Sequence, residues 1–452
     1  MTEGEDMTHP KVRKQHFKTV KEIVKRANGK VVCSACIMGL GQFLYRQWAK
    51  GILYLLIQIA AICFFVFVGA EAIAGFFTLG TIESNAWYGI EGDNSVIMML
   101  MGILAFIVLA IYLYFYYANI KDAYAMQCAV EQGKKPRTLK DEMRSMLDDK
   151  FYKTALFVPI IGVCIFNVLP IVFMILIAFT NYGPDVKPPV LIDWKGFESF
   201  IKVLTLGQFA PTFFKILLWN IVWAVLSTAL NYFCGLGIAL LYNKKCVRGK
   251  AFWRMFPILA YAVPGFITLL GFKFMFSYGG PINQMIVEAG GKAIGFLDLD
   301  AKWSARGIGL VVNCWLNIPS SMLLATGILS NMNRDLYEAA KIDGASAFKQ
   351  FTAITLPFVV FATTPILISQ FIANFNNFGI FYFLRGGGLI ADGYFLASDT
   401  DLLINWLYNL SISNDYYSIG AAISIIIFLF TSAVSLAVYV LSPSYRQEDT
   451  YQ

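Results

Sequence analysis

Charged residues and histidine are scarce in this 452-residue sequence. Only 14% of the residues are charged, whereas soluble domains carry about a quarter, and 58% are hydrophobic. Because so few polar groups cannot cover so much apolar surface, the composition predicts a polytopic membrane protein. The two histidines, His9 and His16, lie in the polar N-terminal segment, which leaves little material for a metal centre or a histidine-based catalytic triad.

Motifs for nucleotides, redox chemistry and secretion are also missing. Gly249-Lys250 and Gly291-Lys292 lack the glycine spacing and the following Ser/Thr of a phosphate-binding loop. Cys33 and Cys36 form a lone CxxC pair, a weak signal for a metal site. The first thirty residues are polar and basic, so no cleaved signal peptide is visible. The net charge of +7 comes from lysines and arginines beside apolar runs, which indicates membrane orientation rather than a nucleic-acid partner.

Apolar runs of membrane-spanning length are abundant. A helix needs about 20 apolar residues to cross the hydrocarbon layer, and each run is continuously apolar rather than alternating, which favours helices over barrel strands. The predicted fold class is an all-α integral membrane protein with eight transmembrane helices. The expected spans are 51–76, 97–120, 154–180, 213–242, 255–277, 307–329, 358–384 and 417–441.

Lysine and arginine are unevenly distributed over the connections between these runs. Eight occur in 121–153 and five in 243–254, whereas 77–96 has none. By the positive-inside rule, both termini and the connection 330–357 are expected in the cytoplasm. Segment 38–50 is too short and too polar to span, so an interfacial position ahead of the first helix is expected.

These expectations divide the chain into four parts. They are a basic cytoplasmic N-terminus with the interfacial segment (1–50), two spans with a basic cytoplasmic loop (51–153), a six-helix core (154–441) that contains the loop 330–357, and a cytoplasmic tail (442–452).

One connection looks like the surface of a soluble protein although it lies between apolar runs. In "LYEAAKIDGASAFKQFTAITLPF", Asp335 is expected to cap a short helix, Gly344 to stop it in a left-handed conformation, and Ser346 to open a second helix that ends at Leu356-Pro357. A short, exposed, amphipathic helix with small residues is typical of an element that docks into a groove on a partner.

Two groups of amide side chains lie inside apolar spans, where they are costly without partners. Asn313 and Asn317 are one helical turn apart, and Gln370, Asn374 and Asn377 have helical spacing between phenylalanines, so each group is expected to share one helix face. Neutral amides beside aromatic rings suit a sugar, whose hydroxyls bind the amides. Hydrogen bonding between spans is the alternative, and the pattern leaves both open.

The polar connection has the spacing of the EAA loop of ABC importer permeases. Glu338-Ala339-Ala340, Gly344, Ile354 and Leu356-Pro357 match that pattern. Together with "YAVPGF", "VNCWL" and "NFNNF", it resembles the larger permease subunit of maltose-type importers from about residue 151 to the C-terminus. The resemblance implies a type I ABC importer permease core. In this family the loop forms a coupling helix in a cleft of a cytoplasmic ATPase, which here implicates Glu338, Ala339, Ala340, Gly344, Leu356 and Pro357.

The resemblance also implies a sugar site midway through the membrane. In the family, the matching positions touch the sugar, and here they are Tyr261, Asn313, Leu316, Asn374 and Asn377. Three neighbouring positions depart from the family's best-known member: Asn317 replaces glycine, Gln370 replaces serine and Ala373 replaces an aromatic residue. Asn317 and Gln370 are therefore added as candidate substrate-binding residues. The outer loop 181–212 is short, whereas that member has a large folded domain there.

The implied function is that of a permease subunit, without enzymatic activity of its own, in an ATP-driven oligosaccharide importer. Maltodextrin or maltose is the leading substrate, and galacto-oligosaccharides or raffinose-type sugars are alternatives. An ion-coupled carrier is a further alternative, but the spans offer only Glu71 and Lys273, near expected outer ends, and Lys215 at an edge.

The implied partners are a second permease subunit in a heterodimer, a cytoplasmic ATPase dimer that binds ATP and Mg, an extracellular sugar-binding lipoprotein and membrane lipid. No cofactor on this chain and no nucleic-acid partner are expected. The N-terminal "GLGQFLYRQWAKGI" resembles oligosaccharide permeases of Gram-positive bacteria, which implies the cytoplasmic membrane of such a cell.

Overall fold

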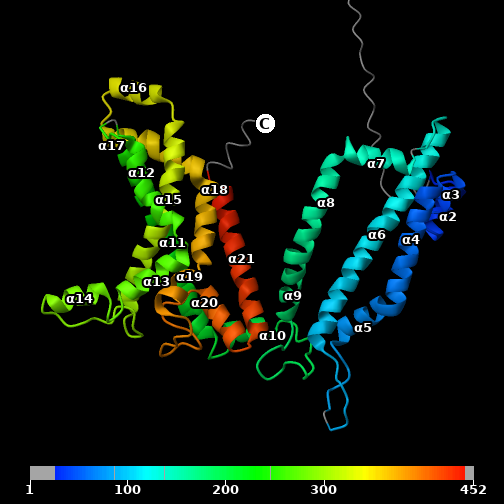
Figure 1. The fold of residues 1–452 in the computed structure, drawn as a ribbon, viewed down its shortest axis with the longest axis horizontal. Helices are drawn as coiled ribbons and strands as arrows, with labels where there is room; N and C mark the ends of the chain where they lie inside the picture. Colours follow the sequence, from blue (N-terminus) through cyan, green and yellow to red (C-terminus); the bar gives the residue numbers. More distant parts are fainter. Residues whose placement is uncertain (1–25, 86, 137, 245, 443–452) are drawn as a thin grey trace, which may run out of the picture. The chain divides into compact units, whose positions relative to one another are not determined.

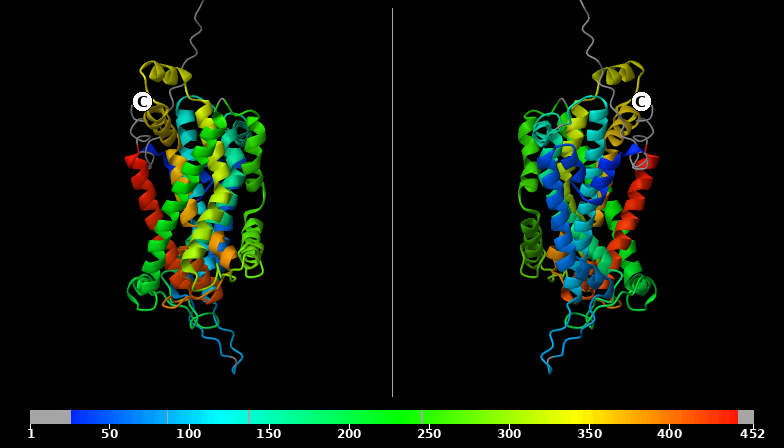
Figure 2. Two further views of the ribbon diagram at one scale, coloured as in Figure 1. Left: turned by 90° about the vertical axis from the view of Figure 1, so that its left-hand side faces the viewer. Right: turned by 90° about the vertical axis from the view of Figure 1, so that its right-hand side faces the viewer.

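The computed structural model describes residues 26–85, 87–136, 138–244 and 246–442 (Figures 1 and 2). The basic N-terminal cluster, with both histidines, and nearly all of the tail 442–452 lie outside these ranges. The described residues are mostly helical, with two isolated β-bridges, Asn85–Ile90 and Thr180–Trp194. The chain divides into two compact units. Unit 1 is Met1–Phe173 with Pro188–Ile192, and unit 2 is Met174–Lys187 with Asp193–Gln452.

The eight-span, all-α prediction is confirmed with one difference. Across the described ranges, seven helices are long and apolar enough to cross a membrane: Trp48–Thr78, Ser95–Glu131, Thr154–Ile177, Ala210–Asn243, Lys302–Ser330, Ala347–Arg385 and Tyr417–Leu441. The eighth span is a bent pair, Lys250–Ala262 with Gly265–Met275, rather than the expected straight helix over 255–277. The two halves meet at an angle of 90°.

Unit 1 is built from three spans with short helices at one end of the bundle. Two of its spans contain a π-helical segment (labelled η) instead of continuing as a uniform α-helix. Its elements are α2 (Gly29–Cys36), α3 (Leu40–Leu44), α4 (Trp48–Phe64), η1 (Phe65–Gly69), α5 (Ala70–Thr78), α6 (Ser95–Glu131), α7 (Leu139–Leu147), α8 (Phe151–Val163), η2 (Cys164–Val168) and α9 (Leu169–Ile177), whose last residues belong to unit 2.

A buried amide holds the short helices of unit 1 against α6. The Asn119 Oδ1 atom accepts hydrogen bonds from Ser34 Oγ (3.0 Å) and from the Gly39 backbone N–H (3.1 Å). Gln42 Nε2 in turn donates to the Asn119 backbone carbonyl (3.1 Å). Segment 38–50 therefore folds into α3 and the start of α4 on the surface of α6, and its interfacial position remains a prediction.

Unit 2 contains five spans and the short helices that flank them. Its elements are α10 (Glu198–Thr205), α11 (Ala210–Asn243), α12 (Lys250–Ala262), α13 (Gly265–Met275), α14 (Pro281–Glu288), α15 (Lys302–Ser330), α16 (Arg334–Ile342), α17 (Ala347–Gln350), η3 (Phe351–Thr355), α18 (Leu356–Phe375), α19 (Gly379–Arg385), α20 (Leu403–Tyr408), η4 (Asn409–Ser413) and α21 (Tyr417–Leu441).

The long helix α11 is the centre of unit 2, where it packs against α15 and α18. Gly235 permits the closest approach, because a Cβ atom there would lie 2.6 Å from the Ser321 Cβ of α15. Between α11 and α18, the Trp223 indole N–H donates to the Asn374 backbone carbonyl (3.1 Å). Asn220 Nδ2 donates to the Phe375 backbone carbonyl (3.0 Å). These bonds satisfy the carbonyls at the end of α18, which have no partner within the helix.

The connection after α19 is fixed by two buried arginines. Arg385 Nη1 donates to Asp399 Oδ1 (2.8 Å) and to two neighbouring hydroxyls. The Arg306 guanidinium lies 3.7 Å from the centre of the Trp219 ring and donates to the Asp399 backbone carbonyl (2.6 Å). Asp401 completes the turn, because its Oδ2 accepts the Ser398 backbone N–H (2.8 Å).

Although part of Asp401 reaches solvent, its carboxyl group is desolvated, and this raises its pKa from 3.8 to about 7. A raised folded-state pKa stabilises the fold at low pH, and this stabilisation is lost as the pH rises from about 4 through about 7. Asp401→Asn removes the buried charge and keeps an acceptor for Ser398. We expect the variant to be more stable than the wild type at pH 8 by about 1–2 kcal/mol, and the difference to shrink towards pH 4.

Thermal unfolding of the purified protein at several pH values measures this difference. The matched control is Asp392→Asn, an exposed aspartate in the same connection. Its unfolding profile should follow that of the wild type. Parallel profiles for all three proteins would contradict the assignment.

Candidate functional site

A break between α12 and α13 opens the interior of unit 2. Val263 (φ −82°, ψ 132°) and Pro264 (φ −53°, ψ 127°) are extended rather than helical. Proline lacks a backbone N–H and disfavours helical geometry at the preceding residue, so the helix stops here and restarts at Gly265 in a new direction. Tyr261 is thereby placed in the last turn of α12. Irregular backbone at membrane depth is tolerated where it is buried in protein or lines a cavity.

A cavity of about 360 Å³ lies beside this break. Five of the seven predicted substrate-binding residues line it: Tyr261, Asn313, Leu316, Asn317 and Asn377. The other lining residues are Ala260, Val263, Gly265, Phe266, Leu269, Gly379, Ile380 and Phe383. Amides from α15 and from the turn before α19 thus face apolar and aromatic groups from the bent pair.

Asn313 is the centre of the amide cluster. Its side chain is fully buried, and its Oδ1 accepts from Asn317 Nδ2 (3.0 Å) and from Asn377 Nδ2 (3.3 Å). Its Nδ2 donates to Asn374 Oδ1 (3.3 Å), and Asn374 Nδ2 donates to Thr228 Oγ1 of α11 (3.0 Å). The cluster therefore joins three helices and the turn before α19. The same amides therefore form hydrogen bonds between spans and contribute to a polar cavity wall.

Two predicted residues lie outside the cavity wall. Asn374 sits behind Asn313 and is 6% exposed. Gln370 lies one helical turn before Asn374 in α18, where its Nε2 contacts Ser321 Oγ (3.4 Å). The structure therefore places both as neighbours of the wall rather than as part of it.

The prediction that Gln370, Asn374 and Asn377 share one helix face is wrong for Asn377. α18 ends at Phe375, so Asn377 lies in the turn that follows. There its Oδ1 accepts the Ile380 backbone N–H (3.2 Å) at the start of α19. From this turn the Asn377 amide still reaches Asn313, the same partner that Asn374 contacts.

The aromatic part of the wall was incompletely predicted. Phe266 and Phe383 line the cavity with ring centres 6.2 Å apart. Phe266 is the last residue of the "YAVPGF" motif, so a signal was present. Phe383 comes from α19, and its position follows only from the break after Phe375, which hydropathy does not reveal.

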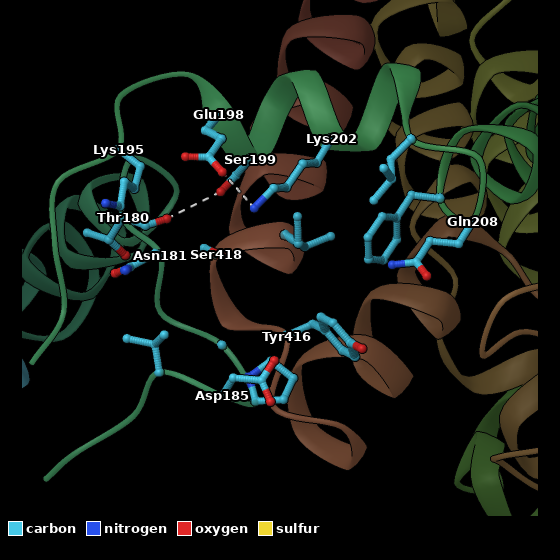
Figure 3. Close-up of a pocket in the computed structure, with 16 residues that line it drawn as sticks. Thr180, Asn181, Asp185, Lys195, Glu198, Ser199, Lys202, Gln208, Tyr416 and Ser418 are labelled. Atoms are coloured by element: carbon cyan, nitrogen blue, oxygen red, sulfur yellow. Dashed lines mark hydrogen bonds and ion pairs between the residues drawn. The ribbon is translucent and has the colours of Figure 1, made fainter. Parts of the chain in front are cut away.

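A second cavity, of about 250 Å³, lies at the far end of unit 2 from α16 (Figures 1 and 3). Segment 180–186, α10 and the start of α21 enclose it. Its polar groups are partly paired, since Lys202 Nζ contacts Glu198 Oε1 (2.8 Å) and Ser199 Oγ donates to the Thr180 carbonyl (3.3 Å). Sequence reasoning missed this cavity, because its walls come from three separate segments, and none of the predicted residues lines it.

The predicted helix–turn–helix at 330–357 is present as α16 and α17. Gly344 has φ +75°, and a Cβ atom added there would meet no other group within 4 Å, so the turn requires the left-handed conformation rather than space. The cap of α16 is Asn333, whose Oδ1 accepts the Asp335 N–H (2.9 Å), and not Asp335 as expected. Ser346 caps α17 as expected.

The helix does not end at Leu356-Pro357. α17 continues through the π-helical segment η3 into α18 without a gap. Pro357 is the second residue of α18 and therefore lies inside this continuous helix, directly after the wider π-helical turn. Glu338 and Ala339 are exposed and Ala340 is half-buried, while Ile342 and Phe348 are 87% and 76% exposed. This apolar, exposed elbow is the surface implied for coupling.

The fold and this site together define an integral membrane permease, and comparison with known proteins gives its family. Residues 231–447 match the family of binding-protein-dependent transport system inner membrane components. The chain is 36% identical over 416 residues to the galactooligosaccharides transport system permease protein GanP of Bacillus subtilis (strain 168), covering 91% of this chain and 97% of that protein.

It is also 33% identical over 438 residues to the maltodextrin transport system permease protein MalC of Streptococcus pneumoniae (strain ATCC BAA-255 / R6), covering 94% and 98% of the two chains. A solved bacterial ABC transporter involved in the import of the acidic polysaccharide alginate has the same fold, with a TM-score of 0.56 at 20% identity over 67% of this chain and 98% of that one. The chain belongs to the binding-protein-dependent transport system inner membrane components, which confirms the resemblance to maltose-type permeases.

The amide cluster gives a stability prediction. Asn374→Leu keeps the side-chain size but leaves the buried Asn313 Nδ2 and the Thr228 hydroxyl without their partner. We expect a loss of about 1–2 kcal/mol in the free energy of unfolding, measured by thermal unfolding in detergent. Asn376→Leu, two residues away and exposed, is the control and should change stability by less than about 0.5 kcal/mol. Equal effects would show that the cluster does not hold the helices together.

Proposed function

We propose that the chain is the membrane-spanning permease subunit of an ATP-driven importer of oligosaccharides. The observation that carries the proposal is the convergence of Tyr261, Asn313, Leu316, Asn317 and Asn377 on one cavity within the spans. Amides supply donors and acceptors for sugar hydroxyls, and the aromatic rings supply apolar surface for the faces of sugar rings. The described residues that line the cavity include no charged side chain, which suits a neutral substrate.

Maltodextrin or maltose is the leading substrate, which agrees with the similarity to MalC. A galacto-oligosaccharide is the second candidate, because GanP is similar over nearly the whole chain. The two relatives come from Bacillus and Streptococcus, which supports the cytoplasmic membrane of a Gram-positive bacterium. With the basic connections inside, both termini and α16 lie in the cytoplasm.

The residues of the cavity divide into two roles. Asn313 is fully buried, its Oδ1 accepts two hydrogen bonds and its Nδ2 donates one, so its side chain is committed to the amide cluster. Asn313 therefore positions Asn317 and Asn377, which keep the Asn317 Oδ1 atom and one Asn377 N–H for a ligand. Tyr261, with 61% of its surface exposed, supplies an aromatic face and a hydroxyl. Asn374 and Gln370 support the wall from behind.

Energy enters through α16 on the cytoplasmic side. A separate ATPase dimer, which binds ATP and Mg, docks against Glu338, Ala339 and Ala340. The Tyr337 hydroxyl bonds to Thr355 Oγ1 (2.8 Å), which ties α16 to the base of α18. Because α17, η3 and α18 are continuous, a displacement of α16 moves the far end of α18, where Asn374 contacts Asn313.

The transport cycle is alternating access around a fixed cavity. An extracellular sugar-binding lipoprotein delivers the oligosaccharide, and a second permease subunit completes the translocation pathway. Nucleotide state shifts the equilibrium only because the ATPase binds the inward-open and outward-open arrangements with different affinity.

Reconstitution into vesicles tests the proposed function. We expect labelled maltotriose to enter only when the ATPase, the second permease, the binding protein and ATP are all present. Asn377→Ala should lower uptake about tenfold, the loss expected from one or two hydrogen bonds to substrate, while the complex assembles normally. Competition with a galacto-oligosaccharide ranks the two sugars. Uptake by this chain alone, driven by an ion gradient, would instead establish a secondary carrier.

Substitution of Gly344 tests the coupling elbow. Valine at φ +75° is strained by about 1–3 kcal/mol, whereas asparagine tolerates this region, and the Cβ atom of either residue would meet no neighbour within 4 Å. Gly344→Val should reduce uptake at least about tenfold while ATP hydrolysis continues, and Gly344→Asn should retain most of the uptake. Side-by-side assays of uptake and ATP hydrolysis measure this separation. Equal uptake by the two variants would contradict a role for the left-handed turn.

A further inference from the structure

The helix α7 of unit 1 carries an apolar strip that the described chain leaves uncovered. Met143, Met146 and Leu147 lie on one side of this helix, and 59%, 48% and 69% of their surfaces are exposed. A capping box in which Thr138 and Asp141 bond reciprocally makes α7 a well-defined helix rather than a loop. The strip is therefore a preformed surface.

Two contacts place α7 level with the ends of two spans of the same unit. At its C-terminal end, Thr154, the first residue of the third span, donates from Oγ1 to the Met146 carbonyl (2.9 Å). At its middle, Glu142 Oε1 pairs with Lys50 Nζ (2.5 Å), two residues into the first span. Figure 1 shows α7 running across from the end of α6 to the start of α8. A helix held at both places lies at the boundary of the hydrocarbon layer.

The charges around α7 complement an anionic surface. Lys140 and Arg144 are exposed and, at about 100° per residue, lie next to Leu147 at the edge of the strip. Lys134 and Lys135 precede the helix, and both are also exposed.

The acidic residues near α7 are paired, take part in capping, or lie beyond the end of the helix. Glu142 is paired with Lys50, which is itself 2% exposed and also bonds Asp122 (3.0 Å). Asp141 takes part in the capping box, and Asp148 and Asp149 follow the end of the helix.

We propose that α7 lies in the surface of the bilayer, with its apolar strip at the acyl boundary and Lys140 and Arg144 on anionic lipid phosphates. An apolar face rimmed by cations is the pattern of an interfacial helix, and cations near an anionic surface each add to its affinity. Through Lys50 and Thr154, the lipid surface would set the angle between two spans. This inference goes beyond the proposed transport function, because it concerns lipid and not sugar.

The test uses the assembled transporter in lipid nanodiscs. A fluorescent amino acid is introduced in place of Met146 in one variant and, in another, in place of Asp148, an exposed residue just beyond the end of the helix. Brominated phosphatidylglycerol and brominated phosphatidylcholine then act as quenchers. We expect several-fold stronger quenching at 146 than at 148, and stronger quenching at 146 by the anionic lipid than by the zwitterionic one.

The charge contribution is tested in the 146-labelled protein. Lys140→Gln with Arg144→Gln should lower the preference for phosphatidylglycerol by on the order of tenfold, since each cation near the surface contributes about fivefold. Lys292→Gln, an exposed lysine of unit 2, is the control and should leave the preference unchanged. Quenching that is equal at 146 and 148, or absent at both because another protein covers the strip, overturns the proposal. Equal quenching by the two lipids in the 146-labelled protein that keeps Lys140 and Arg144 also overturns the proposal. Because the readout is fluorescence, it is independent of whether the complex transports sugar.

Discussion

An asparagine in a membrane interior has no bulk water to bind, so its amide must find partners within the protein. Asn313 is fully buried and makes hydrogen bonds to Asn317, Asn374 and Asn377, and Asn374 extends the chain of bonds to Thr228. The geometry of the cavity depends on this constraint. Because Asn374 and Asn377 flank the end of α18, the same bonds that satisfy Asn313 also fix where α18 stops. The bonds among these amides, with Thr228 and Trp223 of α11, keep the polar groups of the wall in place.

Helix interruptions provide the space that the amides line. The extended pair Val263–Pro264 bends one span by 90°, and the turn after Phe375 separates α18 from α19. Each break frees backbone groups that a straight helix would have satisfied, and both lie beside the cavity. In α19, the freed Ile380 N–H is accepted by Asn377, a residue that also bonds Asn313. The same amides thus hydrogen-bond the helices to one another and line the cavity. This is why the sequence pattern alone could not decide between hydrogen bonding between spans and a sugar site.

Hydropathy was sufficient to predict the spans, and the amide pattern together with the family resemblance selected five of the 13 residues that line the cavity. The failures have a common physical origin. The span expected at 255–277 is bent because hydropathy measures transfer to lipid and is blind to the backbone effect of Pro264. Asn377 was assigned to a helix face because its spacing fits 3.6 residues per turn, although the helix has already ended. Phe383 could not be found, because its place depends on that ending. Asn333 rather than Asp335 caps α16, since both are suitable residues and only the backbone distinguishes them.

α17, η3 and α18 form one continuous helix between the proposed coupling elbow and the amide cluster. A helix that ended at Leu356-Pro357 would leave a flexible joint between the elbow and the span, and a push on α16 would be absorbed there. In the structure, Pro357 lies inside a continuous helix, directly after a wider π-helical turn, where the backbone departs from regular α-helix. Tyr337 bonds to Thr355 within that turn. The elbow is therefore joined to α18 by unbroken helix rather than by a loop, and the far end of α18 carries Asn374, which accepts a hydrogen bond from Asn313.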